Sequence, residues 1–579
     1  MDFNLLPKVF RTEGDIAEFD PTKILNSVID ETGLNEEEAK KVTELTVRRI
    51  VSTGIKFLSG PHIREIVCSI LSEQNYEQER KIYTRIGMPL MDYEKILEQS
   101  IKSNSNFINP EGIHEIASSR FSEEYSHLKI LSEEESRSHL FGDFHIHNLN
   151  FFELKPQSFW LDPRVIFKHG IPPTVTIKSH GKLNSAEDLR EALNHIILWL
   201  SMIKGEFSGV LGINFINVFL APFVGNISDN QLKNHLLYFF NQLNLISLIT
   251  SKKIPNIFIS ISPVIPALLE NTQAISKKGE IHGLYKDYQN ACFRLYNIFT
   301  DIIKDMEENN FQNPKFVIFF NKKWTTSKKN SYTKLISTDF SKYPLFLVNL
   351  DNMWINEKFL KLSQSNSFWN FEIAQEITLN LPRYAYTSKD KDNFLTILES
   401  KLELVDKIFL KKKELLYKRS NSGILPLSNL KINSDKIISR NEQLYAISFI
   451  GLNEKKILLL IQQHYKESPE QSLNIILKSN YSKGIITRFT ELDRKHFPQE
   501  IKIVVPEKIY RYTNNLEVNL NKETALNQLL ERESYFQSLI KGFFYVKVQN
   551  SKLTKETYPF IDLLQHICTK TDIGLIKLS

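Results

Sequence analysis

Three short apolar segments decide the fold of this chain: IFISI at 257–261, FVIFF at 316–320 and LFLVN at 345–349. Runs of this length and character are typical of strands buried on both faces of a sheet. The same character predicts strands at Phe144–Asn148 and Val175–Ile177. Between the strands lie segments with helical periodicity at 185–203, 228–249 and 394–409, and we expect Ser185 with Asp188 to cap the first. Strands that alternate with helices predict an α/β fold with parallel strands and helical crossovers.

The composition bounds the class of protein. The chain has 579 residues, enough for more than one domain, and 42% of them are hydrophobic, which excludes long disorder. The net charge of +6 is spread along the sequence, so we expect no nucleic-acid partner. The N-terminus lacks the pattern of a signal peptide, and no apolar run is long enough to span a bilayer. We therefore expect a cytoplasmic protein without a membrane partner.

The three cysteines, Cys68, Cys292 and Cys568, lie far apart in the sequence. This spacing excludes a disulfide framework and a zinc site made of four thiolates. So few cysteines in a long chain suit the reducing cytoplasm. We expect all three to be ordinary packing residues.

Residues 1–95 predict a small, mostly helical domain. The stretch VFRTEGDIAEF at 9–19 reads as two strands around a Glu-Gly turn. Three helix starts follow: Asp20 before Pro21, the capping box of Asn35 and Glu38, and Ser59 before Gly60-Pro61. A fourth helix is expected to begin at Asn75 and Gln78 and to end at Gly87.

This N-terminal segment resembles the ATP-cone, the allosteric nucleotide-binding module of ribonucleotide reductases. The resemblance departs from the usual V-x-K-R-D-G hairpin at two positions, where Arg11 and Thr12 replace lysine and arginine. A glycine turn allows backbone to approach a phosphate, which basic side chains can neutralise. The resemblance implies that ATP or dATP binds as an allosteric ligand, with these nucleotide-binding residues: Val9, Arg11, Thr12, Gly14, Phe19, Lys23, Tyr83 and Arg85.

The rest of the chain resembles the large subunit of the anaerobic (class III) ribonucleoside-triphosphate reductases, of the archaeal type. The matching motifs occur in the family's order along the sequence. They are GDFHIH at 142–147, NVFLAP at 217–222, TLNLPR at 378–383, GLNE at 451–454 and RFTELDR at 488–494. The resemblance implies a ten-stranded α/β barrel at 106–579, preceded by the ATP-cone at 1–95 and a linker at 96–105.

The groups that the family's radical chemistry requires are missing. The resemblance implies a thiyl-radical cysteine shortly before TLNLPR, but no cysteine lies between Cys292 and Cys568. Ser158 stands where a second, strand-borne cysteine belongs, and Lys483 replaces a glutamate. The sequence given also reaches Ser579 where the zinc and radical-glycine segment would begin, so we expect neither zinc nor a glycyl radical and assign no catalytic residue.

Three functions remain open. The first is a pseudoenzyme that binds adenine nucleotides and acts through a homodimer or a hetero-oligomer with a full-length reductase. The second is a working ribonucleoside-triphosphate reductase whose radical groups come from another chain. The third is a scaffold that binds no nucleotide.

Two further patterns have plain interpretations. His145 and His147 have the spacing of metal ligands on one face of a strand. The sequence offers no third ligand, so we favour structural packing and expect no metal. Lys411, Lys412 and Lys413 read as the solvated end of a helix.

Overall fold

The computed structural model describes most of the chain: residues 7–10, 16–55, 57–84, 86–88, 90–102, 110–171, 183–250, 256–308, 313–325, 345–352, 370–432, 435–436, 443–452, 455–467, 473–479, 483–496, 517–518, 530–531, 534, 536–537, 539–540, 546–548 and 560–578. It divides into two compact units. The N-terminal unit comprises Met1–Ser105 with Ile113–Glu134, and the large unit comprises Asn106–Gly112 with Glu135–Ser579. The predicted strand Val175–Ile177 lies outside the described residues.

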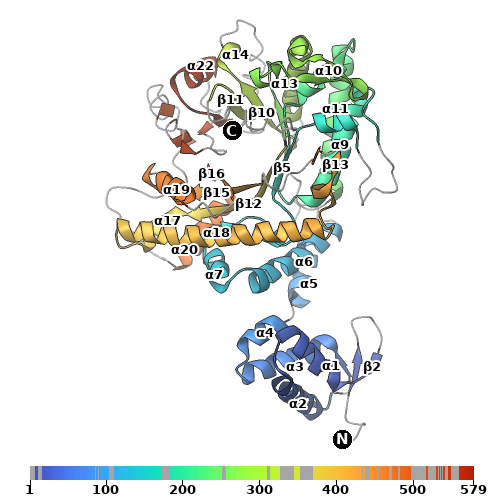
Figure 1. The fold of residues 1–579 in the computed structure, drawn as a ribbon, viewed down its shortest axis with the longest axis vertical. Coiled ribbons are helices and arrows are strands. Elements are labelled where there is room, and N and C mark those ends of the chain that lie inside the picture. The colour runs from blue at the N-terminus through green and yellow to red at the C-terminus, as the bar shows by residue number, and fades with distance from the viewer. Residues whose placement is uncertain are drawn as a thin grey trace. The chain divides into compact units, whose positions relative to one another are not determined.

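The N-terminal unit has the predicted hairpin and four helices, and a fifth helix, at 90–102, covers much of the segment 96–105 that was expected to be a linker. Strands β1 (Lys8–Phe10) and β2 (Ile16–Glu18) pair antiparallel, and β3 (Phe57–Ser59) adds a parallel partner to β1 that we did not predict. The helices are α1 (Pro21–Thr32), α2 (Glu36–Thr53), α3 (Gly60–Glu73), α4 (Glu77–Tyr83) and α5 (Leu90–Lys102) (Figure 1).

Local capping explains most of these helix boundaries. The Asp20 carboxylate accepts from the Thr22 amide, and Asn35 and Glu38 form a reciprocal capping box. Gly33 ends α1 in the left-handed region, where an added side chain would be strained. The expected fourth boundary was wrong: α4 begins after Tyr76 without a side-chain cap and ends at Tyr83, before Gly87.

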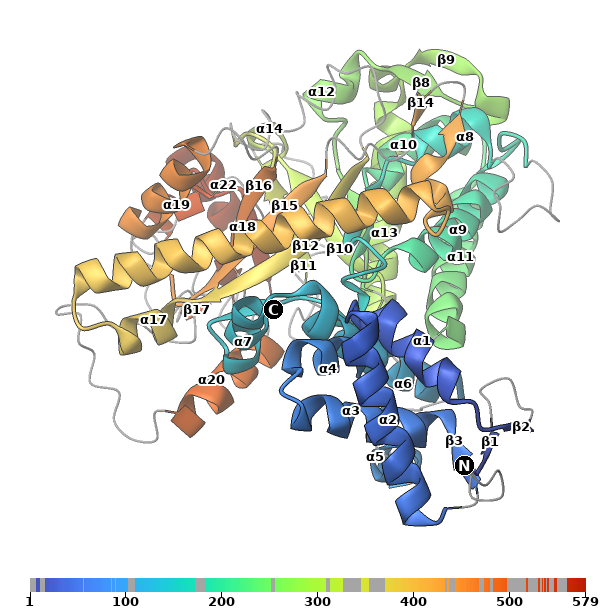
Figure 2. The ribbon, with the colours of Figure 1, turned by 60° about the horizontal axis from the view of Figure 1, so that its bottom comes forward.

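The large unit is built on one curled sheet, as its α/β class predicts (Figure 2). Five strands run parallel at its centre: β5 (Ser158–Leu161), β6 (Leu211–Ile213), β7 (Ile257–Ile261), β10 (Lys315–Phe320) and β11 (Leu345–Asn349). A second parallel block consists of β12 (Phe371–Asn380), β15 (Leu444–Ile450) and β16 (Asn474–Ser479).

The two blocks meet in an antiparallel junction, which alternation of strands and helices did not predict. Strand β12 is ten residues long, so one edge accommodates two partners. Its start pairs antiparallel with β5 and its end pairs antiparallel with β4 (Phe144–Ile146). Beyond β11 the next strand is β19 (Leu575–Leu578), which is antiparallel to β11. It is followed by β18 (Val546–Val548) and β17 (Glu517–Val518), and each of these is parallel to the strand before it.

Helices cover the outer face of the sheet and bury its apolar side chains. On the five-strand block these are α9 (Leu189–Glu206), α10 (Ile216–Val224), α11 (Asp229–Thr250) and α13 (Gln289–Glu308) (Figure 2). Phe316 of β10 contacts both Phe240 of α11 and Phe299 of α13. The cap of α9 is Asp188 alone, not Ser185, whose hydroxyl donates instead to the Lys168 carbonyl.

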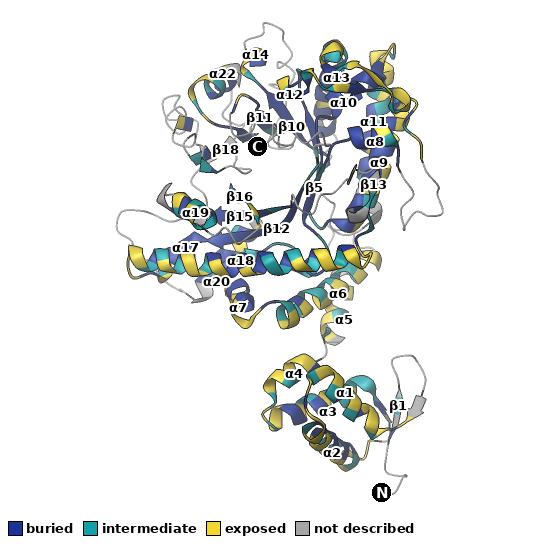
Figure 3. Cartoon of the chain, in the orientation of Figure 1, coloured by how far each residue is buried: buried dark blue, intermediate teal, exposed yellow. Residues whose placement is uncertain are grey.

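The long helix α18 (Lys391–Asn421) crosses the second block and shows alternating buried and exposed residues along its length (Figure 3). The prediction that Lys411, Lys412 and Lys413 form a solvated helix end was wrong, because α18 continues ten residues beyond Lys411. Lys412 is 1% exposed, and its ammonium donates to the carbonyls of Phe152 and Lys155. These two carbonyl acceptors allow a burial of the ammonium that an unpaired charge would not tolerate.

Candidate functional site

Three of the sequence motifs converge on Arg383, whose side chain is 12% exposed. The Arg383 guanidinium, at the end of TLNLPR, donates Nε to Asp143 Oδ1 at 2.7 Å and Nη1 to Asp493 Oδ1 at 2.6 Å. Asp143 belongs to GDFHIH and Asp493 to RFTELDR. The Lys401 ammonium of α18 lies 2.7 Å from the other Asp143 oxygen. The motifs that are far apart in sequence therefore meet in a single ionic network.

Asn380 completes this network. Its amide nitrogen donates to the Gly142 carbonyl at 3.0 Å and to Asp493 Oδ2 at 3.1 Å. Its amide oxygen accepts from the Arg383 backbone and caps helix α17 (Leu381–Thr387). Burial alone would raise the pKa of Asp143, but Lys401 and Arg383 hold that pKa below its ordinary value. The Asp143 carboxylate is thus kept ionised, and the network ties β12, β4 and helix α20 (Lys483–His496) together.

A second polar cluster lies on the face of the second block that is opposite to α18. The odd-numbered side chains of β15 face the helix, as the contact of Tyr445 with Phe409 shows. Register then places Thr378, Ser448 and Lys478 side by side on the other face. We call the following set the inner polar group: His147, Glu376, Thr378, Ser448 and Lys478.

The inner polar group is closely connected. His147 Nε2 lies 2.7 Å from Thr378 Oγ1, which lies 2.6 Å from Ser448 Oγ. The Lys478 ammonium lies 2.7 Å from Glu376 Oε2. Burial alone would raise the pKa of Glu376, but Lys478 and His147 outweigh it and lower that pKa to about 2. The group therefore contains a fixed ion pair beside an imidazole and two hydroxyls, which could bind polar ligands or relay protons.

Of this group, sequence analysis singled out His147 alone. Glu376, Ser448 and Lys478 belong to none of the motifs quoted above. A search for charged residues inside strand-like segments would have found Glu376 and Lys478.

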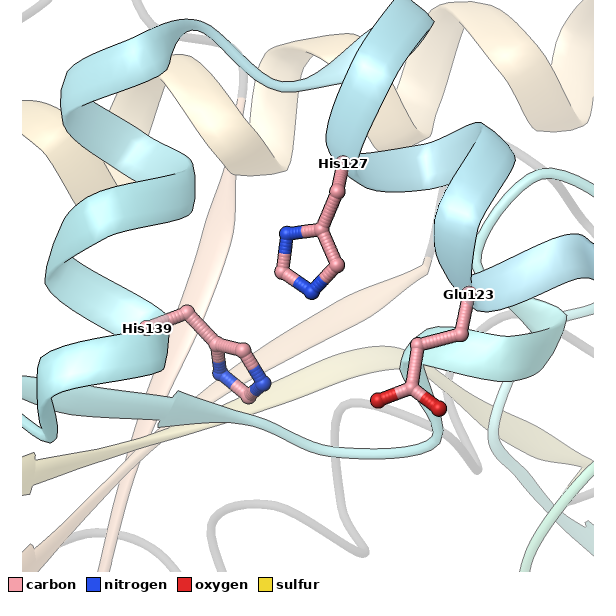
Figure 4. A group of neighbouring side chains, drawn as sticks. All are labelled: Glu123, His127 and His139. Atoms are coloured by element: carbon pink, nitrogen blue, oxygen red, sulfur yellow. The ribbon is translucent and has the colours of Figure 1, made fainter. Parts of the chain in front are cut away.

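The rings of His145 and His147 contact each other and other side chains of the large unit. Their ring centroids are 4.9 Å apart, and the His145 ring also lies 5.2 Å from that of His139. His139 projects from α7 (Glu133–Phe141), as Figure 4 shows. In the N-terminal unit, Figure 4 also shows Glu123, on α6 (Pro110–Tyr125), and His127, on the following π-helical turn.

Ser158 begins β5 opposite Ile373 of β12. It is 6% exposed, and its hydroxyl oxygen accepts from the Val210 amide at 3.2 Å. Lys483 is the first residue of α20, and its side chain lies outside the described residues. Among the cysteines, Cys292 is fully buried and its thiol lies 3.3 Å from the Asn217 amide. Burial raises the pKa of the Cys568 thiol to about 12, so this thiol stays protonated at neutral pH.

The candidate nucleotide residues are only partly described. Arg11, Thr12, Gly14 and Arg85 lie outside the described residues. Val9 pairs with Ala17 in the β1–β2 hairpin, Phe19 is buried in the core of the N-terminal unit, and Lys23 is exposed on the first turn of α1.

Tyr83 is held by the core of the N-terminal unit. It is 4% exposed, and its hydroxyl lies 2.9 Å from Ser27 Oγ. The Arg64 guanidinium lies 4.2 Å from the centre of its ring and donates both Nη groups to Glu31. Tyr83 therefore orders α1 and α3 against α4, and a direct contact of its ring with nucleotide stays a prediction.

We predict that Arg383→Ala lowers the free energy of unfolding of the large unit by about 3 kcal/mol, because the buried Asp493 and the half-buried Asp143 lose their common partner. Arg383→Lys should recover only part of the lost stability, since an ammonium lacks the planar guanidinium geometry that lets Arg383 donate to both carboxylates. Urea denaturation followed by circular dichroism measures both. Lys233→Ala is the matched control, because the Lys233–Asp305 pair is exposed and should contribute at most about 1 kcal/mol. Equal losses for Arg383→Ala and Lys233→Ala would contradict the assigned role.

Residues 102–479 match the family model of anaerobic ribonucleoside-triphosphate reductase. A search of curated protein sequences finds no match. Within the described residues, no helix combines the length and apolar character needed to cross a bilayer.

Solved structures of this family are similar in fold. One anaerobic ribonucleotide reductase gives a TM-score of 0.66 at 15% identity, covering 89% of this chain and 88% of its own. The enzyme from Thermotoga maritima in complex with dATP and CTP gives 0.64 at 15% identity, covering 89% and 90%. The same enzyme with citrate in the active site gives 0.64 at 16%, covering 90% and 98%. Because the family model spans more than half of the sequence, the chain belongs to the anaerobic ribonucleoside-triphosphate reductase family.

Proposed function

We propose that this chain is a regulatory member of its family that does not reduce ribonucleotides by itself. The observation that carries the proposal is the absence of any cysteine between Cys292 and Cys568, together with Ser158 at the position expected for the strand thiol. The N-terminal unit would bind ATP or dATP as an ATP-cone of the archaeal type. The three unpaired cysteines support a place in the reducing cytoplasm.

The chemistry supports this interpretation. Hydrogen abstraction from a ribose needs a thiyl radical, and an O–H bond is too strong for a serine to supply an equivalent. The Ser158 hydroxyl oxygen moreover accepts a hydrogen bond from the Val210 amide. The motif residues Asp143, Asn380, Arg383 and Asp493 form an ionic network that stabilises the fold without any radical group. A chain of this family can therefore keep its architecture after the loss of the thiols.

We predict no deoxynucleotide formation when the full chain is incubated anaerobically with a glycyl-radical activase, S-adenosylmethionine, a reductant and ribonucleoside triphosphates. The reason is that no cysteine stands at either position where the family's thiols are expected. Product chromatography and EPR spectroscopy measure the outcome, with a catalytically competent reductase as the positive control. Turnover, or a glycyl-radical doublet, would contradict the proposal and favour the second function, in which another chain supplies radical groups.

The nucleotide proposal is supported by the β1–β2 hairpin, the capped start of α1 and the exposed Lys23 on its first turn. A helix N-terminus and basic side chains both attract phosphate. We predict that the full chain binds ATP or dATP with micromolar affinity and that Arg11→Ala weakens binding by about 1–3 kcal/mol.

Isothermal titration calorimetry tests this prediction. Arg49→Ala serves as the matched control, because Arg49 pairs with Glu73 on the surface between α2 and α3 and should leave affinity unchanged. Absence of heat and of thermal stabilisation at millimolar nucleotide would instead indicate the scaffold without ligand.

A chain without catalytic activity could regulate other proteins by assembling with them. Helices α9 and α11 of the large unit expose Leu198, Tyr238 and Leu245. Between these helices lies a cavity of about 260 Å³ lined by charged and aromatic side chains, including Arg190, Glu191, His235 and Phe239. A surface that offers both charges and apolar area can pair with a second copy or with a full-length reductase. Nucleotide can act on such a protein only by favouring one assembly over another.

We predict that ATP and dATP give different oligomer distributions in mass photometry, alone or mixed with a full-length reductase. Tyr238→Asp should shift each distribution towards monomer, because it places a charge in the apolar part of the surface. Tyr417→Asp is the control, since Tyr417 is similarly exposed on a different helix, α18. A monomer under every condition, without effect on reductase turnover, would contradict the assembly proposal.

A further inference from the structure

The Arg64 side chain of α3 joins two other helices of the N-terminal unit. Its Nη1 donates to Glu31 Oε2 at 2.9 Å and its Nη2 donates to Glu31 Oε1 at 2.6 Å, so it holds both carboxylate oxygens of a residue on α1. Nη1 also donates at 2.6 Å to the carbonyl of Tyr83, the last residue of α4. Arg64 is therefore fixed by α4 on one side and holds α1 on the other.

Tyr83 reinforces this arrangement through its buried ring. The Arg64 guanidinium lies 4.2 Å from the centre of the ring, which orients the arginine further. The Tyr83 hydroxyl lies 2.9 Å from Ser27 Oγ, and the Ser27 hydroxyl donates to Glu31 Oε1 at 2.8 Å. Two polar residues of α1, one turn apart, are thus held by a single connected group of side chains.

Lys23 lies on the same side of α1 as these contacts. Lys23, Ser27 and Glu31 follow one another at intervals of four residues, which places them along one side of a helix. The buried Ile24 and Val28 attach α1 to the core, but apolar packing is not directional. The hydrogen bonds to Ser27 and Glu31 are directional, so they set the rotation of α1 and with it the placement of the exposed Lys23.

We propose that Arg64 is a positioning residue for nucleotide: by holding Glu31 it orients α1 so that Lys23 can contact phosphate. This inference rests on the proposed binding of ATP or dATP by the N-terminal unit. Charge alone predicts a different pattern. Because ATP is an anion, loss of the Arg64 charge would weaken its binding and loss of the Glu31 charge would strengthen it. If the pair orients α1, loss of either partner weakens binding.

Isothermal titration calorimetry of the full chain with ATP separates these patterns. Arg64→Ala and Glu31→Ala should each weaken binding by about tenfold, because the contact of Lys23 with phosphate is displaced. In a Lys23→Ala background, Arg64→Ala should have less than about twofold further effect, since the residue through which it acts is gone. Arg49→Ala and Glu73→Ala are the matched controls. That pair has the same bidentate geometry, with two contacts of 2.8 Å between α2 and α3, and its loss should leave affinity unchanged.

Wild-type affinity in Arg64→Ala and Glu31→Ala, or tighter binding by Glu31→Ala, would overturn the positioning role and leave the proposed nucleotide binding intact. Absence of ATP and dATP binding by the wild type would overturn the nucleotide proposal and this inference with it. If an alanine variant does not fold, Arg64→Lys and Glu31→Gln replace it, because each breaks the bidentate contact with little change in side-chain size. Both should weaken binding by about threefold, and wild-type affinity in both would overturn the role.

Discussion

The large unit depends on the position of one guanidinium. Arg383 joins carboxylates from two other segments, Asp143 before β4 and Asp493 on α20. A buried arginine with two acidic partners is tolerated only when its hydrogen bonds are satisfied, and Asn380 and Lys401 complete that condition here. These contacts fix the end of β12. The register of β4 and the positions of the inner polar group follow from them.

A second set of cations extends this anchoring along α18. Lys401 contacts Ser138, Lys411 pairs with Glu135, and Arg419 donates to the Glu153 carbonyl. With the buried Lys412, these side chains fasten residues 135–155 to one helix. That segment leads directly into β5, so the position of Ser158 opposite β12 is set by contacts made before the strand begins.

Architecture and chemistry are therefore separable in this chain. Four polar side chains of these motifs, Asp143, Asn380, Arg383 and Asp493, form hydrogen bonds with one another. The family fold consequently carries no implication that the radical reaction takes place. The proposed regulatory function depends on surfaces of the large unit and on the N-terminal unit.

The sequence alone determined the local features. Strands β7 and β11 were predicted at their observed bounds, because apolar β-branched runs between turns have few alternatives. The caps of α1 and α2 were readable for the same reason, since a cap involves residues only two or three positions apart. The absence of cysteine across the central region is likewise a property of the sequence. Only tertiary structure decided the antiparallel junction of β12 with β5, the burial of Lys412 and the meeting of His147, Glu376 and Lys478. Each of these depends on pairing between distant segments, and a single polar residue in an apolar strand does not indicate which partner will neutralise it.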